Sequence, residues 1–190
     1  TGHKCLPLPQ HEGKITAEQV RKAVLAQRND PSAEHLVQPA MVYISQSTEL
    51  GTLYTRKELE ELASVCRALG LYLFLDGARL GYALAARSND LTLEDIARLT
   101  DVFYIGGTKA GALFGEAVVI TDERLKKDFR YMIKRQGGML AKGRLLGIQY
   151  EVLMEDDLYT ELGRHANVLA AKIKEAFLKK GYESYMDSVT

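Results

Sequence analysis

Four short stretches of the chain are apolar, apart from the serine and the aspartate that end the first two. They are AMVYIS at 40–45, LYLFLD at 71–76, VFYI at 102–105 and AVVI at 117–120. Their β-branched and aromatic residues and their shortness indicate strands rather than helices. Strands that are apolar at every position are typical of a parallel sheet covered on both faces. The pattern therefore predicts an α/β fold built on a mostly parallel sheet.

The segments between these strands contain residues that are typical of the starts and ends of helices. Thr16 and Thr55 are N-cap residues followed by helical stretches, and Gly70 follows the second stretch as a C-terminal glycine does. Strands that alternate with helices predict three layers, with helices on both faces of the sheet. Helices are expected at 17–28, 56–69, 77–87, 91–99, 121–135, 141–157 and 158–181.

The two ends of the chain suggest how it is divided. We expect residues 1–155 to form the central part of a large domain. Residues 156–190 are expected to form a helix that leads into an incomplete C-terminal small domain. The chain starts at Thr1 rather than at methionine and ends in YESYMDSVT, where another strand could begin. We therefore expect it to be a fragment of a longer polypeptide.

The composition of the chain argues against some classes of binding partner. The 190 residues carry 25 basic and 25 acidic side chains, which are interspersed and argue against a nucleic acid or an anionic membrane surface as partner. Two cysteines are too few for a disulfide framework or a zinc site, and no metal site is expected. No apolar run reaches the length of a membrane span, and no secretory signal is visible. We expect a cytoplasmic protein that acts on a small molecule.

Polar residues follow three of the predicted strands: QSTE at 46–49, Asp76 with Arg79, and Thr108 with Lys109. Because ligands of open α/β sheets bind beyond the carboxyl ends of the strands, these are the candidate site residues. A carboxylate directly after an apolar run, as at Asp76, needs a cationic or hydrogen-bonding partner. The alternative is that Asp76 caps a helix and Arg79 pairs with it. Arginine is disfavoured in a first helical turn, however, which points both side chains toward a ligand.

Lys109 lies in the sequence GGTKAG, residues 106–111. A solvated loop lysine is the ordinary alternative. Against it, the glycines let the backbone approach a ligand closely, and a desolvated lysine becomes a competent nucleophile. A lysine and an aspartate at separate strand ends are what a pyridoxal phosphate site needs. The lysine holds the aldehyde as a Schiff base, and the carboxylate keeps the ring nitrogen protonated.

Three stretches carry a family resemblance: YISQSTELGTLYT, LFLDGARLGYAL and DVFYIGGTKAGALFGEAVVI. They resemble the pyridoxal phosphate enzymes of the aspartate-aminotransferase fold (fold type I), and most closely the low-specificity L-threonine aldolases of the β-eliminating lyase group. The resemblance implies that Lys109 binds the cofactor, that Asp76 pairs with its pyridine nitrogen and that Arg79 lies near its phenolic oxygen. Thr108, at a position where the family more often has serine, is included among the cofactor-binding residues. Ala110 stands where the family usually has glycine.

Glu49 departs from the family pattern, because this loop often carries a histidine near the substrate hydroxyl at that position. A carboxylate can serve there as the general base, and a solvated or indirect role is the alternative. The resemblance implies cleavage of L-threonine or a related β-hydroxy-amino acid to glycine and an aldehyde, by a homodimer or homotetramer. It also places the phosphate cradle and a ring-stacking histidine upstream of this segment, and the arginine that binds the substrate carboxylate downstream.

The sequence leaves other functions open. The same cofactor supports an aminotransferase or another β-eliminating lyase. The LFLD strand and the Thr-Lys strand end also fit a phosphoryl-transfer protein, but no acidic pair and no GxxxxGK[ST] motif accompany them. A non-catalytic scaffold of the same fold is the last alternative.

Overall fold

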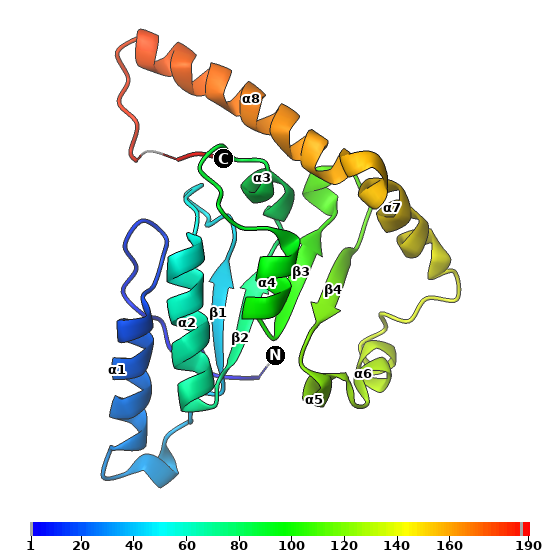
Figure 1. Cartoon of the computed structure of the whole chain (residues 1–190). Helices are drawn as coiled ribbons and strands as arrows, with labels where there is room; N and C mark the ends of the chain where they lie inside the picture. Colours follow the sequence, from blue (N-terminus) through cyan, green and yellow to red (C-terminus); the bar gives the residue numbers. More distant parts are fainter. Residues whose placement is uncertain (1, 187) are drawn as a thin grey trace.

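The computed structural model describes residues 2–186 and 188–190 of the chain. Its centre is a sheet of four strands in the order β1-β2-β3-β4 (Figure 1). β1 pairs in parallel with β2 and β2 with β3, whereas β4 runs antiparallel to β3. The mostly parallel sheet is confirmed, and every predicted strand lies within one residue of its expected bounds. The strands are β1 (Met41–Ser45), β2 (Tyr72–Asp76), β3 (Val102–Gly106) and β4 (Glu116–Ile120).

The helices of the N-terminal half begin where the capping residues predict. α1 (Ala17–Arg28) and α2 (Arg56–Leu69) each follow a threonine that exchanges hydrogen bonds with the third helical residue, which forms a capping box. Gly70 ends α2 in the left-handed conformation at φ 65°, which glycine adopts without steric cost. α3 (Leu80–Leu84) is shorter than the predicted helix, and α4 (Leu93–Leu99) follows it.

Helix boundaries in the C-terminal half differ from the prediction. The helix expected at 121–135 is broken, because Lys127 is extended and Asp128 is left-handed, a conformation that aspartate tolerates. Asp156 and Asp157 are left-handed as well, and they end the next expected helix early. No helix of the described residues is both long and apolar enough to cross a bilayer. The elements are α5 (Glu123–Lys126), α6 (Phe129–Arg135), α7 (Arg144–Met154), α8 (Leu158–Lys179) and the 3-10 turns η1 (Ala33–His35), η2 (Thr108–Ala110) and η3 (Glu155–Asp157).

One face of the sheet carries the hydrophobic core. α2 and α4 lie over this face and α1 packs against α2 (Figure 1). Burial of these apolar side chains contributes most of the stability of such a layer. Its most deeply buried members are Leu59, Leu62, Leu73, Leu75, Leu80 and Ile96.

The opposite face is only partly covered within the described residues. Met41 and Tyr43 are each 52% exposed. The Tyr43 ring stacks on Phe74 with centroids 5.2 Å apart, and Phe74 meets Tyr104 edge to face at 5.0 Å. An aromatic row therefore crosses β1, β2 and β3 on this face. The wholly apolar strands predict cover on both faces, and this chain supplies full cover on one of them.

Helix α8 crosses near the carboxyl end of the sheet and packs on α3 (Figure 1). A Cβ atom on Gly163 would lie 2.1 Å from the Gly81 carbonyl oxygen, so the two backbones touch. The Gly81 N–H donates to the Tyr159 hydroxyl at 3.0 Å, and the Asn167 Nδ2 donates to the Tyr82 carbonyl at 2.9 Å. The predicted domain boundary stays a prediction, but α8 begins in close contact with the sheet layer.

Candidate active site

Two glycines bring the ends of β2 and β3 into backbone contact. Gly77 follows β2, Gly106 ends β3, and the Gly106 N–H donates to the Gly77 carbonyl at 2.9 Å. A Cβ on Gly77 would lie 2.0 Å from the Tyr104 carbonyl oxygen, and one on Gly106 would lie 2.4 Å from the Ala78 carbonyl oxygen. Neither position has room for a side chain. The turn after β2 and residues 106–111, which we call the lysine loop, therefore leave the sheet side by side.

Asp76 ends β2, and its carboxylate is held by two donors. The Ala78 N–H donates to Oδ1 at 2.9 Å, and the Tyr43 phenol donates to Oδ2. Burial, together with the hydrogen bond to Asp76 and its charge, raises the pKa of Tyr43 above its ordinary value, so the phenol stays protonated. α3 begins only at Leu80, so Asp76 is not its N-cap and the helix-capping alternative is wrong. The carboxylate is instead oriented at the end of the strand.

Arg79 pairs with Glu49 rather than with Asp76. Its Nη1 lies 2.8 Å from Glu49 Oε1, and the two side chains are 30% and 73% exposed. They come from the segments after β2 and β1, so the ion pair joins neighbouring strand ends at one edge of the sheet. This geometry is compatible with both roles that the sequence leaves open for Glu49.

Lys109 lies in η2 and is exposed, as is the adjacent Thr108. The sequence predicts a desolvated amine here. In this chain the glycines on either side remove neighbouring side chains, and the amine faces solvent. Within the described part of the chain, the Lys109 ammonium has no ion-pair partner. The main chain of the loop is nevertheless anchored, because the Tyr82 phenol donates to the Lys109 carbonyl and the Gly107 N–H donates to Glu116 Oε2 at 2.9 Å.

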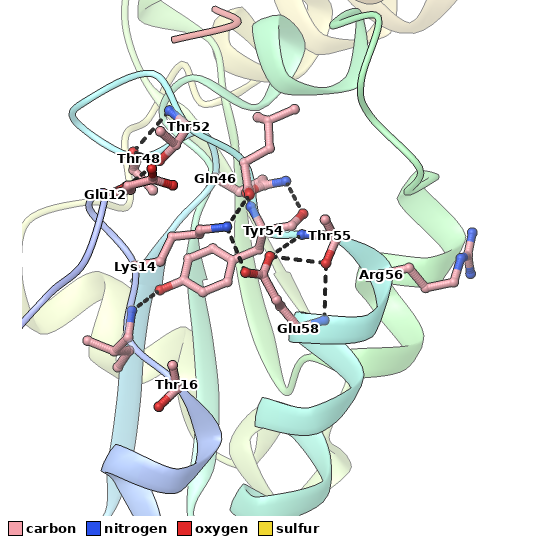
Figure 2. A network of polar contacts seen from close by, with 12 residues as sticks. Glu12, Lys14, Thr16, Gln46, Thr48, Thr52, Tyr54, Thr55, Arg56 and Glu58 are labelled. Carbon is pink, nitrogen blue, oxygen red and sulfur yellow. Dashed lines mark hydrogen bonds and ion pairs between the residues drawn. The ribbon is translucent and has the colours of Figure 1, made fainter. Parts of the chain in front are cut away.

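A buried polar network fixes the loop that carries Glu49 (Figure 2). The Gln46 side-chain amide accepts the Tyr54 N–H at 2.9 Å and donates to the Tyr54 carbonyl at 3.1 Å. The hydroxyls of Thr48 and Thr52 are 2.7 Å apart. The three residues before Glu49 are buried. Of the candidate stretch 46–49, the structure therefore exposes Glu49 at the edge and uses the rest to hold the loop.

Sequence reasoning missed the two tyrosines that touch the predicted site residues. Ser45 and Asp76 are register partners, and Tyr43 lies two residues before Ser45 on β1. The side chains of Tyr43 and Asp76 are therefore on the same face of the sheet, where they meet. That register cannot be read from either strand alone. Tyr82 lies six residues after Asp76, in the helix predicted at 77–87, and this place beside the strand end was the available signal for the second tyrosine.

The beta-eliminating lyase family matches residues 1–185. The chain belongs to this family. It is 32% identical over 174 residues to a low specificity L-threonine aldolase of Pseudomonas aeruginosa, covering 92% of this chain and 49% of that enzyme. A second low specificity L-threonine aldolase, from a Pseudomonas species, is 34% identical over 169 residues, or 87% of this chain and 47% of its own length. A structure of Leishmania major threonine aldolase matches with a TM-score of 0.94 and 49% identity, over all of this chain and 54% of that one.

The chain thus spans about half the length of the curated relatives it matches. Enzymes of the beta-eliminating lyase family use pyridoxal phosphate. The residues present fit that cofactor: Asp76 is an oriented carboxylate, Lys109 an unpaired amine on a glycine loop, and Arg79 a cation at the same edge. Among the described residues, no group of three or more His, Cys, Asp or Glu side chains is placed to hold a metal ion.

Proposed function

We propose that the full-length protein is a pyridoxal phosphate-dependent lyase that cleaves L-threonine, or a related β-hydroxy-amino acid, to glycine and an aldehyde. The observation that carries this proposal is the backbone contact at Gly77 and Gly106, which sets the Asp76 turn beside the lysine loop. Similarity to threonine aldolases along nearly the whole chain supports the choice of reaction.

Each residue at this edge has a role in the proposal. Asp76, held by Tyr43 and the Ala78 N–H, accepts a hydrogen bond from the ring nitrogen of the cofactor. Lys109 binds the cofactor covalently, and Arg79 and Thr108 bind its ring substituents. When bound, pyridoxal phosphate supplies the electron sink for the pair of electrons released as the Cα–Cβ bond breaks.

Glu49 is proposed to accept the proton of the substrate β-hydroxyl. The Arg79 guanidinium holds one oxygen of the Glu49 carboxylate at 2.8 Å. The replacement Glu49→Gln keeps the shape of the side chain and removes the base. A fall in kcat with little change in KM supports the role of base, because such a loss affects the reaction and not substrate binding. An unchanged kcat would leave Glu49 as a partner of Arg79 only.

Assembly and location complete the proposal. We propose a cytoplasmic homodimer or homotetramer, consistent with the exposed apolar side chains on α6, α7 and α8. Sedimentation velocity on the full-length protein measures the assembly, and a monomer at all concentrations would contradict it.

The experiment that tests the function is an absorbance scan of the full-length protein with pyridoxal phosphate, before and after borohydride reduction. Reduction is expected to fix the cofactor on Lys109, and Lys109→Ala is expected to abolish the visible band. Lys22→Ala, at an exposed position on α1, is the matched control and should leave the band unchanged. Acetaldehyde and glycine formed from threonine support the aldolase, whereas a keto acid, or pyruvate with ammonia, assigns another reaction of the same cofactor.

A further inference from the structure

Tyr82 connects the lysine loop to two helices. It lies on α3, its phenol donates to the Lys109 carbonyl, and its own carbonyl accepts a hydrogen bond from Asn167 of α8 at 2.9 Å. The Tyr82 phenol thus supplies a side-chain hydrogen bond to the main chain of Lys109 itself. We propose that Tyr82 is a positioning residue that fixes the lysine for its reaction with the cofactor.

The lysine loop benefits from such a tie, because it is rich in glycine. It contains Gly106, Gly107 and Gly111, and Gly111 adopts φ 97°. Glycine retains more conformational freedom than any other residue, so a loop rich in glycine costs more entropy to order. After Gly106, the last residue of β3, its regular structure in the described chain is the three-residue turn η2. A hydrogen bond to the lysine carbonyl limits the positions that the amine can reach, and orientation of a reacting group contributes directly to rate.

The support behind Tyr82 is rigid. The next residue, Gly81, touches Gly163 of α8 so closely that a Cβ on Gly163 would lie 2.1 Å from the Gly81 carbonyl oxygen. The hydroxyl of Tyr159, a residue 3% exposed, accepts the Gly81 N–H at 3.0 Å. The backbone at Tyr82 therefore cannot shift without moving α8. Through Tyr82, α8 therefore helps to fix the position of the Lys109 carbonyl.

This inference rests on the proposed function, in which Lys109 binds the cofactor, but the tie can be measured without it. The first experiment is hydrogen exchange on the cofactor-free full-length protein with Tyr82→Phe, which removes one oxygen and keeps the ring. The amides of Ala110 and Ala112, which bond to the Gly107 carbonyl at 2.9 and 3.0 Å, are expected to exchange about fivefold faster, as for the loss of one ordinary hydrogen bond. Tyr131→Phe, at a 73% exposed position on α6, is the control and should change nothing.

The second experiment separates positioning from general stability. With cofactor and threonine, Tyr82→Phe is expected to lower kcat three- to tenfold, leave KM within twofold and leave the thermal midpoint unchanged. Asn167→Ala should act in the same direction, and the double variant should lose no more than Tyr82→Phe alone, because both act through one contact. Unchanged exchange in the loop, or faster exchange with unchanged kcat, overturns the inference. If the protein binds no pyridoxal phosphate, the proposed function fails, and the exchange comparison alone decides the role of Tyr82.

Discussion

At the scale of single residues, the site depends on glycines, because a Cβ atom at these positions would collide with neighbouring backbone. Gly106 has no Cβ because the Ala78 carbonyl oxygen occupies the space, 2.4 Å from where that atom would be. Gly106→Ala is expected to lower the free energy of unfolding by about 3 kcal/mol, since the obstacle is backbone and cannot rotate away. Chemical denaturation measures this change, and cofactor binding should weaken with it.

Gly147 provides the matched control for that substitution. It lies inside α7 with nothing within 4 Å of a Cβ atom. Gly147→Ala should raise the free energy of unfolding by about 1 kcal/mol, because alanine is the better helix former. If both variants were equally stable, the backbone contact at Gly106 could not be what holds the two strand ends together.

Tyr54 is expected to make the free energy of unfolding depend on pH in the alkaline range. Burial raises the pKa of Tyr54 from 10.0 to about 12, and the nearby Glu58 carboxylate adds to the effect. Because the pKa is higher in the folded state, the stabilisation is complete below pH 10 and is lost as the pH rises toward 12. Denaturation between pH 9 and pH 12 should show a loss of about 2 to 3 kcal/mol from this group. The loss should be smaller by that amount in Tyr54→Phe, and equal pH dependence in both proteins would contradict the assignment.

Some residues of the site can be predicted from the sequence next to them, and others depend on contacts between distant segments. The placement of Asp76 and Lys109 at neighbouring strand ends was predictable, because Asp76 directly follows one apolar run and Lys109 lies in the short loop after the next. Tyr43 was not, because its contact with Asp76 depends on the register between β1 and β2, two strands that α2 separates in the sequence. The exposure of Lys109 was not predictable either, since it depends on which segments cover the loop.

At the scale of elements, the capping residues were the most reliable signals. Thr16 and Thr55, which the sequence predicts as N-caps, each precede a helix in a capping box, because the geometry involves only four consecutive residues. Thr92 forms a third capping box, which was not predicted from the sequence. The helix breaks at Asp128 and Asp156 were missed, because their left-handed backbone is a possibility for aspartate and not a preference. Local chemistry therefore predicts where these helices start better than where they end.

An ion pair between helices offers a second pH test. The Arg56 guanidinium of α2 binds both carboxylate oxygens of Asp95 of α4 at 2.5 Å, and it holds the pKa of Asp95 well below its usual range. Because the folded-state pKa is lowered, the stabilisation is present above pH 4 and is lost as the pH falls below it. Asp95→Asn should be less stable than the unmodified protein at pH 7, and thermal melts should show the gap narrowing as the pH falls below about 4. Glu61→Gln, exposed on α2, is the control, and a gap independent of pH would argue against the ion pair.

At the scale of the whole molecule, the described residues cover the sheet fully on one face and partly on the other. Its core face is closed by α2 and α4, while the aromatic row on the other face stays partly exposed. The curated relatives it matches are about twice as long. The apolar strands predicted the sheet correctly. Strands of this composition are typical of a sheet that is covered on both faces, whichever part of the protein covers the second face.

The partly exposed sheet face leads to a prediction about association of the 190-residue chain alone. Acidic and basic side chains balance at 25 each, so near neutral pH no net charge opposes contact between copies. Met41 and Val118, 52% and 44% exposed, lie on this face, and Met41→Lys with Val118→Lys should shift the sedimentation of the chain toward monomer. Val37→Lys, 53% exposed but in a loop, adds charge without touching the sheet and should have a much smaller effect. An equal shift from Val37→Lys would mean that net charge, and not the apolar face, controls association.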